Sequence, residues 1–137
     1  MRRVFLVTAT IAATLASGSA SGPAGHSPIC TRGLTTVERD PRRLLPISEI
    51  NPIGAAIAAA LRYERKVARP QVQGALFATA DRQRGPEARY SCGTRVWRRT
   101  IVVYILDRAM LPAQSAAQRV YFVGRFRSGY HVWQIVH

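Results

Sequence analysis

The chain contains few of the residue types that carry out acid/base, nucleophilic or metal chemistry. Its 137 residues include three histidines and seven acidic residues. His131 and His137 lie on one expected strand about 20 Å apart, which prevents them from sharing a metal ion. A catalytic triad would have to combine one of them with Ser91 or Ser115, and the sequence has no Gly-x-Ser-x-Gly motif. We therefore predict no catalytic residue, no metal site and no cofactor, and we expect His131 to be partly buried, capping a hairpin.

Glu64 is the one acidic residue whose position raises a question of function. It falls on the stripe of an expected helix that also carries Ile53, Ile57 and Leu61. The simpler interpretation is that its long side chain reaches solvent at the end of the helix. If it faces the interior instead, its pKa should rise unless an arginine such as Arg99 meets it. A lone acid in a pocket would suit a small enzyme, in which Glu64 or His131 would be the acid or base.

A row of arginines and tyrosines offers binding chemistry. It belongs to the last two expected strands and consists of Arg119, Tyr121, Arg125, Arg127 and Tyr130. Arginine forms bidentate hydrogen bonds with anionic groups, and arginine and tyrosine side chains also stack on ligands. The formal net charge of +13 should attract anionic partners. The row is a candidate solvent-facing surface for anionic or sugar-like ligands, with Arg98 alongside, but an ordinary solvated strand face has the same pattern and is the simpler interpretation.

The first twenty residues have the layout of a secretory signal peptide. Arg2 and Arg3 form a positive start, residues 4–16 are uncharged and mostly apolar, and small residues lead to Ala20. The apolar stretch is shorter than the ~20 residues that span a bilayer, so we expect cleavage and no transmembrane span afterwards. Membrane anchoring and a twin-arginine export route are the alternatives.

Export would define both the location and the partners. The mature chain is expected outside the cytoplasm, secreted or in the cell envelope, with no intracellular nucleic acid as a partner. Candidate partners are an anionic envelope polymer or lipid, or another exported protein. In an oxidising compartment, Cys30 and Cys92 most simply form one disulfide, which would close a loop of about 62 residues. Two free thiols, or a catalytic cysteine, are the competing interpretations.

One helix and about four strands are expected to position these residues. Asn51 and Pro52 are typical of a helix start, and Pro70 closes that segment. Extended segments are predicted at 72–79, 89–95, 96–106, 119–126 and 130–136, with a turn at 83–86 and a loop at 112–117. Residues 21–46 form an expected flexible tail and irregular arm, and 47–137 a single α+β domain.

The last two strands are expected to form a hairpin around Ser128 and Gly129, so that Arg127 pairs with Tyr130. The further predicted pairs are Phe126 with His131, Gly124 with Trp133, Phe122 with Ile135, and Val120 with His137. This register places Phe122, Phe126, Trp133 and Ile135 on one face and the arginine–tyrosine row on the other. A three-residue loop with Gly129 as a bulge would shift the register by one and swap the faces of the last strand.

These elements predict an α+β domain in which a curved antiparallel sheet wraps around one N-terminal helix. That arrangement resembles cystatin-like and NTF2-like domains, an analogy of architecture that says nothing firm about function. A partly open β-barrel or sandwich is the alternative. The expected function is that of a small, basic, exported, non-enzymatic binding or interaction domain. The alternatives are a small hydrolase-like enzyme, which would need a hollow helix–sheet interface, and an inhibitor of an exported enzyme.

Overall fold

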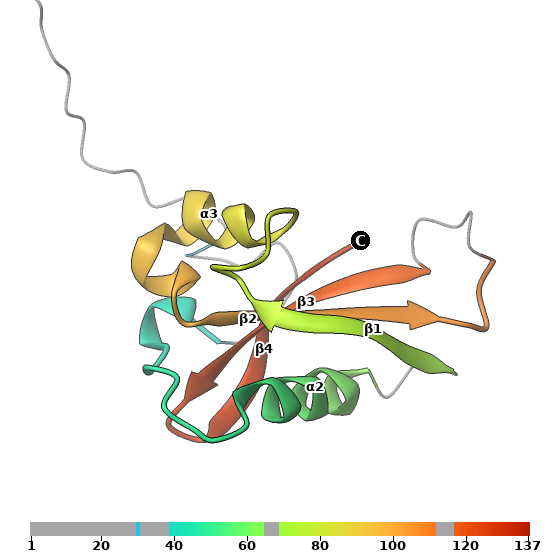
Figure 1. The fold of residues 1–137 in the computed structure, drawn as a ribbon, viewed down its shortest axis with the longest axis horizontal. Coiled ribbons are helices and arrows are strands. Elements are labelled where there is room, and N and C mark those ends of the chain that lie inside the picture. The colour runs from blue at the N-terminus through green and yellow to red at the C-terminus, as the bar shows by residue number, and fades with distance from the viewer. Residues whose placement is uncertain (1–29, 31–38, 65–68, 112–116) are drawn as a thin grey trace, which may run out of the picture.

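A four-stranded antiparallel sheet organises the chain, with one helix on each of its faces (Figure 1). The computed structural model describes Cys30 and residues 39–64, 69–111 and 117–137. In chain order the elements are η1 (Pro41–Arg43), α2 (Pro52–Tyr63), β1 (Pro70–Phe77), α3 (Gly85–Trp97), β2 (Thr100–Asp107), β3 (Gln118–Phe126) and β4 (Gly129–Val136). The spatial order of the strands is β1-β2-β3-β4, so the sheet is open and the α+β class is confirmed. The predicted signal peptide lies outside the described residues, as do residues 21–29 and 31–38 of the predicted tail and arm and residues 112–116 of the predicted loop.

Helix α2 begins where the sequence predicts. The Asn51 side chain accepts a hydrogen bond from the Gly54 backbone N–H at 2.9 Å, which satisfies one of the free donors of the first turn. The buried residues of the helix are alanines, Ala56, Ala59 and Ala60, whereas Leu61 is 37% exposed. The expected stripe of larger aliphatic residues is therefore only partly right. Small side chains on the buried face let α2 lie close against the sheet.

A second helix stands where a turn and a strand were expected. The predicted turn at 83–86 leads into α3, which begins at Gly85, and residues 89–95 lie within the helix, so the predicted strand containing Cys92 is wrong. The Asp81 carboxylate accepts the backbone N–H groups of Gln83 and Arg84, and a proline in the first turn suits a helix start. The helix extends to Trp97, so β2 begins at Thr100 and not at Val96.

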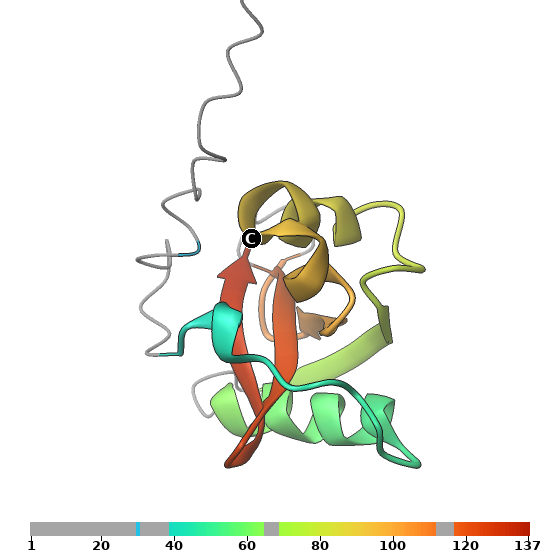
Figure 2. The same ribbon diagram turned by 90° about the vertical axis from the view of Figure 1, so that its left-hand side faces the viewer.

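The two helices cover opposite faces of the sheet, as Figure 2 shows. The α2 face is packed with Ala56, Ala60, Ile101, Val103, Tyr121, Val123, Val132 and Ile135. The opposite face, toward α3, is packed with Leu44, Ala88, Val96, Val102, Phe122, Phe126 and Trp133. Because strands covered on both faces need apolar residues at successive positions, β2 is a continuous apolar run.

The terminal hairpin forms, but in a different register. Phe126 pairs with Gly129 and Arg125 with Tyr130, so the expected pairing of Arg127 with Tyr130 is wrong. The register then shifts between Phe122 and Val123, which pair with Gln134 and Val132 and leave Trp133 as the extra residue. The other predicted pairs, from Phe126–His131 to Val120–His137, are likewise not formed. This bulge keeps Trp133 with Phe122 and Phe126 on the α3 face, as expected, but moves Ile135 to the α2 face.

Candidate functional site

The structure divides the predicted arginine–tyrosine row between two environments. Tyr121 and Tyr130 lie beneath α2 with 0% and 6% of their surface exposed, so the expectation that they face solvent is wrong. Arg119 forms an ion pair with Glu64 at 2.9 Å, and Arg125 pairs with Glu49 at 2.8 Å. Arg127, at the tip of the hairpin, is exposed. Of the five residues, it is the one that remains at the surface with no ion pair to a carboxylate of the described chain.

Glu64 lies at the centre of a buried polar network. Its carboxylate accepts hydrogen bonds from the Arg119 guanidinium and from the Tyr121 hydroxyl. Burial raises the pKa of Tyr121, and the neighbouring carboxylate raises it further. Burial alone would lower the pKa of Arg119, but Glu64 more than offsets this and raises it. The carboxylate thus neither reaches solvent nor pairs with Arg99, and its partners make it a structural group that closes the end of α2.

A basic groove lies between the arm and the hairpin tip. It has a volume of about 530 Å³ and is lined by Arg39, Arg43, Leu45, Phe126, Arg127 and Ser128. We call this set the tip groove. The Arg39 guanidinium lies 5.7 Å from the centre of the Phe126 ring and donates a hydrogen bond to Ser128 Oγ at 3.1 Å. Stacking and this hydrogen bond hold one face of the guanidinium in place and leave other N–H groups available for an anion.

The arm that carries Arg39 and Arg43 is fixed by specific contacts. Leu44 is buried against Gly124, and the Leu45 N–H donates to the carbonyl of Arg125 at 2.8 Å. The Arg99 guanidinium donates to the Leu44 carbonyl at 2.6 Å. The predicted disulfide between Cys30 and Cys92 is present, with 5.3 Å between their Cα atoms, and ties the start of the arm to α3. These contacts position one wall of the tip groove against the other.

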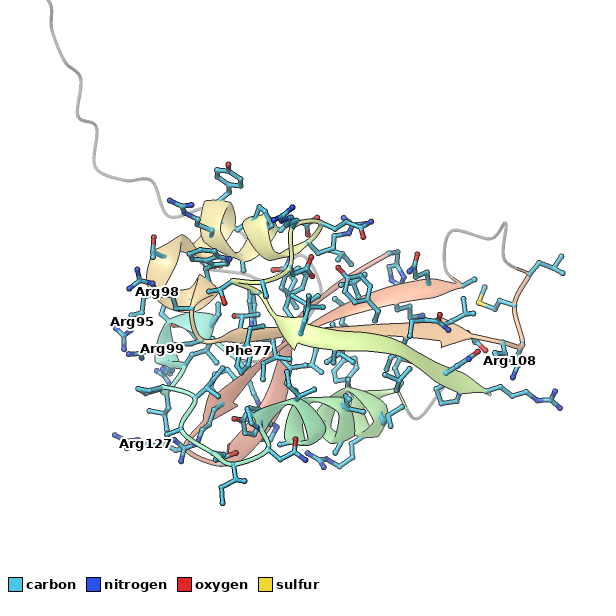
Figure 3. The ribbon with its side chains drawn as sticks, viewed as in Figure 1. Phe77, Arg95, Arg98, Arg99, Arg108 and Arg127 are labelled. Carbon is cyan, nitrogen blue, oxygen red and sulfur yellow. A yellow bond between two sulfur atoms is a disulfide. The ribbon has the colours of Figure 1, made fainter. Side chains whose placement is uncertain are left out.

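No described carboxylate forms an ion pair with Arg39, Arg43 or Arg127, although the charge of Arg43 helps to lower the pKa of Asp40, whose ion-pair partner is Arg42. Four of the described carboxylates form ion pairs with arginines: Asp40 with Arg42, Glu49 with Arg125, Glu64 with Arg119, and Glu87 with Arg84. Asp81 accepts from Tyr104 and backbone N–H groups, and Asp107 accepts from the Ala109 N–H. Figure 3 shows that Arg95, Arg98 and Arg99 lie at the same end of the molecule as Arg127. This end is therefore strongly basic, with a concave centre.

His131 lies beside Ser128, but the geometry does not suit catalysis. Its Nε2 is 3.0 Å from Ser128 Oγ and 3.2 Å from the Ser128 carbonyl oxygen. A carbonyl can only accept, so the contact with it is a hydrogen bond in the tautomer that carries the proton on Nε2, and in that tautomer Nε2 has no lone pair with which to activate the hydroxyl. Burial lowers the pKa of His131, with Arg39 and Arg62 contributing. The half-buried ring, 6.0 Å from the Phe126 ring, supports the hairpin tip as expected.

Buried side chains pack together at both helix–sheet interfaces of the described chain. The α2 face buries the aromatic ring of Tyr121 together with aliphatic residues, and the α3 face buries Phe122 and Trp133 with their rings 5.4 Å apart. Within the described residues, no group of histidine, cysteine and carboxylate side chains could hold a metal ion. No helix in that part of the chain is long and apolar enough to cross a membrane.

Sequence reasoning identified Arg127 but missed Arg39 and Arg43. A signal for these two arginines was present in the sequence, in the Arg42-Arg43 doublet and in the Asp40-Pro41 pair before it. Asp40 caps η1, because its side chain accepts a hydrogen bond from the Arg42 N–H. What the sequence could not supply is the contact between the arm and a hairpin more than eighty residues away, as in the Arg39–Ser128 hydrogen bond. No protein family, curated protein or solved structure matches this chain, so its function has to be argued from the tip groove itself.

Proposed function

We propose that this protein is a small exported, non-enzymatic domain that binds an anionic polymer of the cell envelope through the tip groove. The observation that carries the proposal is the convergence of Arg39, Arg43 and Arg127 on one concavity, where none of them forms an ion pair with a described carboxylate. Guanidinium groups recognise carboxylate and phosphate oxygens through paired hydrogen bonds. Phe126 and Leu45 add apolar surface against which the backbone of such a polymer can pack.

The shape of the site favours a polymer over a lipid surface. The arginines line a recess between two chain segments, whereas a bilayer surface would be met by a flat or convex face with apolar side chains at its centre. An extended acidic chain can enter the recess and place successive charges against successive arginines. Cleavage of the proposed signal peptide removes Arg2 and Arg3 and lowers the net charge from +13 to about +11, which still adds a longer-range attraction that speeds association and weakens with salt.

Export and architecture belong to the same proposal. The disulfide supports an oxidising compartment, and the sequence of residues 1–20 supports a cleaved signal peptide. The packed helix–sheet interface supports binding over catalysis, because a hydrolase of this architecture would need a hollow interior. The cystatin-like and NTF2-like resemblance stays an analogy of architecture.

The test compares binding of the disulfide-bonded protein to polygalacturonate, which bears carboxylates, and to polyphosphate. Replacing Arg43→Glu together with Arg127→Glu should weaken binding at least about tenfold, because two anion contacts become repulsive. The matched control is Arg62→Glu with Arg82→Glu, which changes the net charge equally at exposed positions outside the tip groove. Equal losses in both double variants would show that overall charge, not the groove, binds the polymer. Binding of vesicles rich in phosphatidylglycerol, with no binding of either polymer, would contradict the choice of a polymer.

A further inference from the structure

A second basic site lies at the other end of the sheet. Arg69, Pro70, Gln71 and Arg108 line a depression of about 510 Å³. Arg69 immediately precedes β1 and Arg108 immediately follows β2, and the antiparallel pairing of Pro70 with Asp107 brings the two arginines together. The Arg108 N–H donates to the Arg69 carbonyl at 3.1 Å, which fixes the two backbones side by side. Both arginine residues are exposed. We call this the β1–β2 end site.

The β1–β2 end site also lacks an acidic neighbour at its surface. Asp107 is the adjacent acid, but it is 7% exposed and its carboxylate accepts the Ala109 N–H at 2.9 Å. No ion pair joins Arg69 or Arg108 to a carboxylate in the described parts of the chain. The site therefore presents two guanidinium groups and the Gln71 amide to solvent, a set that suits carboxylate or phosphate oxygens.

The two basic sites face away from each other along the long axis of the molecule. Figure 3 shows Arg108 at one extreme and Arg127 at the other. Strand β2 connects the two ends, since Thr100 pairs with Gly124 near the tip groove and Asp107 precedes the β1–β2 end site. Its eight residues span roughly 23 Å at ~3.3 Å per residue. One short anionic segment therefore cannot occupy both sites.

We infer that the protein is bivalent and cross-links polyanionic chains, holding one at the tip groove and another at the β1–β2 end site. This inference rests on the proposed function and extends it from binding to bridging. A rigid sheet with binding sites at opposite ends keeps them apart, so it favours contacts with two chains over two contacts with one short segment. Bridging of long chains would build a network, in which the gain from multivalency exceeds the affinity of either end.

Cross-linking is measured by light scattering when the disulfide-bonded protein is mixed with long polygalacturonate or long polyphosphate. Binding is measured separately by calorimetry with a short oligogalacturonate, which cannot be shared between distant sites. The variant Arg69→Glu with Arg108→Glu should scatter at least about tenfold less than the unmodified protein, because one of its two ends no longer binds. Its affinity for the short oligomer at the tip groove should change by less than about twofold. A large excess of unmodified protein should dissolve the network, since every chain is then saturated.

The matched control separates bridging from simple charge neutralisation. Arg62→Glu with Arg82→Glu lowers the net charge by the same amount and should keep the scattering. Equal loss of scattering in this control would overturn the inference, as would undiminished scattering by the Arg69→Glu, Arg108→Glu variant. Failure of the proposed function gives a different result: the Arg43→Glu, Arg127→Glu variant would bind as many short oligomers per protein, with the same affinity, as the unmodified protein does. Thermal unfolding of each variant checks that the fold is retained.

Discussion

Replacing Gly124 by alanine should dislodge the arm that carries one wall of the tip groove. A Cβ atom at this position would lie 2.1 Å from Leu44 Cδ2, 2.9 Å from Cδ1 and 3.1 Å from Cγ. Carbon atoms pack at about 3.5–4.0 Å, so the leucine has to retreat by about 1.4 Å or leave its rotamer. Leu44 is 1% exposed and its own carbonyl accepts from Arg99, so it has little room to move. We expect Gly124→Ala to lower the free energy of unfolding by about 1–3 kcal/mol, as other overpacked cores do.

The assay is urea denaturation of the disulfide-bonded protein, followed by the fluorescence of its two tryptophans. Gly74→Ala is the matched control, because Gly74 is also a strand glycine but has no atom within 4 Å of the added Cβ. This control should change stability by less than about 1 kcal/mol. In the double variant Gly124→Ala with Leu44→Ala, the clash is removed, so the two losses should be clearly less than additive. Additive losses, or a stability of Gly124→Ala equal to that of the control, would refute the contact between Leu44 and Gly124.

Three further changes probe the ion pair, the disulfide and the acid response. Glu64→Ala should lower the free energy of unfolding, measured in urea, by about 2 kcal/mol, which is less than the loss of a fully buried ion pair because the Arg119 side chain is 25% exposed. Glu64→Gln should lower the free energy of unfolding by less than Glu64→Ala does. Equal losses in the two variants would contradict the ionic role. Replacing Cys30 and Cys92 by serine should cost about 4 kcal/mol, since the bridge spans 62 residues, and an unchanged urea midpoint would exclude a closed bridge in the native protein. Burial would raise the pKa of Asp81, but hydrogen bonds from backbone N–H groups and from Tyr104 lower it below 3.8. The Asp81 carboxylate therefore contributes fully to stability above about pH 4, and this contribution is lost as the pH falls through the pKa of Asp81 in the folded protein. Asp81→Asn should therefore flatten the decline in unfolding free energy between about pH 4 and pH 2, and an unchanged slope would contradict the assignment.

Local sequence signals were sufficient to predict a helix that begins with a good capping residue followed by proline. The Asn51 cap and Pro52 predicted α2 correctly because both act within one turn of the chain. Helix α3 was missed because its apolar stripe, Ala88, Cys92 and Val96, contains no large side chain. It also contains Gly93, whose φ of +83° interrupts the helical backbone. Asp81 accepts the Gln83 and Arg84 N–H groups in the turn just before the helix, and the N-cap residue Arg84 makes no capping hydrogen bond through its side chain, so the start of the helix carries little signal in the sequence.

The hairpin register could not be predicted from its turn alone. The sequence correctly grouped Phe122, Phe126 and Trp133, because large aromatic residues have to be buried together. It could not anticipate the bulge at Trp133, which lets the tryptophan and Ile135 face opposite sides although they are two residues apart. The bulge is favoured by tertiary packing on both faces at once, and that packing depends on α3, the element that was missed.

The burial of the tyrosines and the exposure of the tip arginines have a common cause. An arginine–tyrosine alternation was interpreted as a solvated face because antiparallel sheets often have one open side. Here α2 covers that side, and the arginines at its margins are neutralised by Glu64 at the end of the helix and Glu49 ahead of it. The chain has only seven acidic residues, so each carboxylate that pairs with an arginine of the sheet leaves one fewer carboxylate to pair with the arginines at the surface. Exposed arginines without a described ion pair consequently remain at both ends of the sheet, where they line the tip groove and the β1–β2 end site.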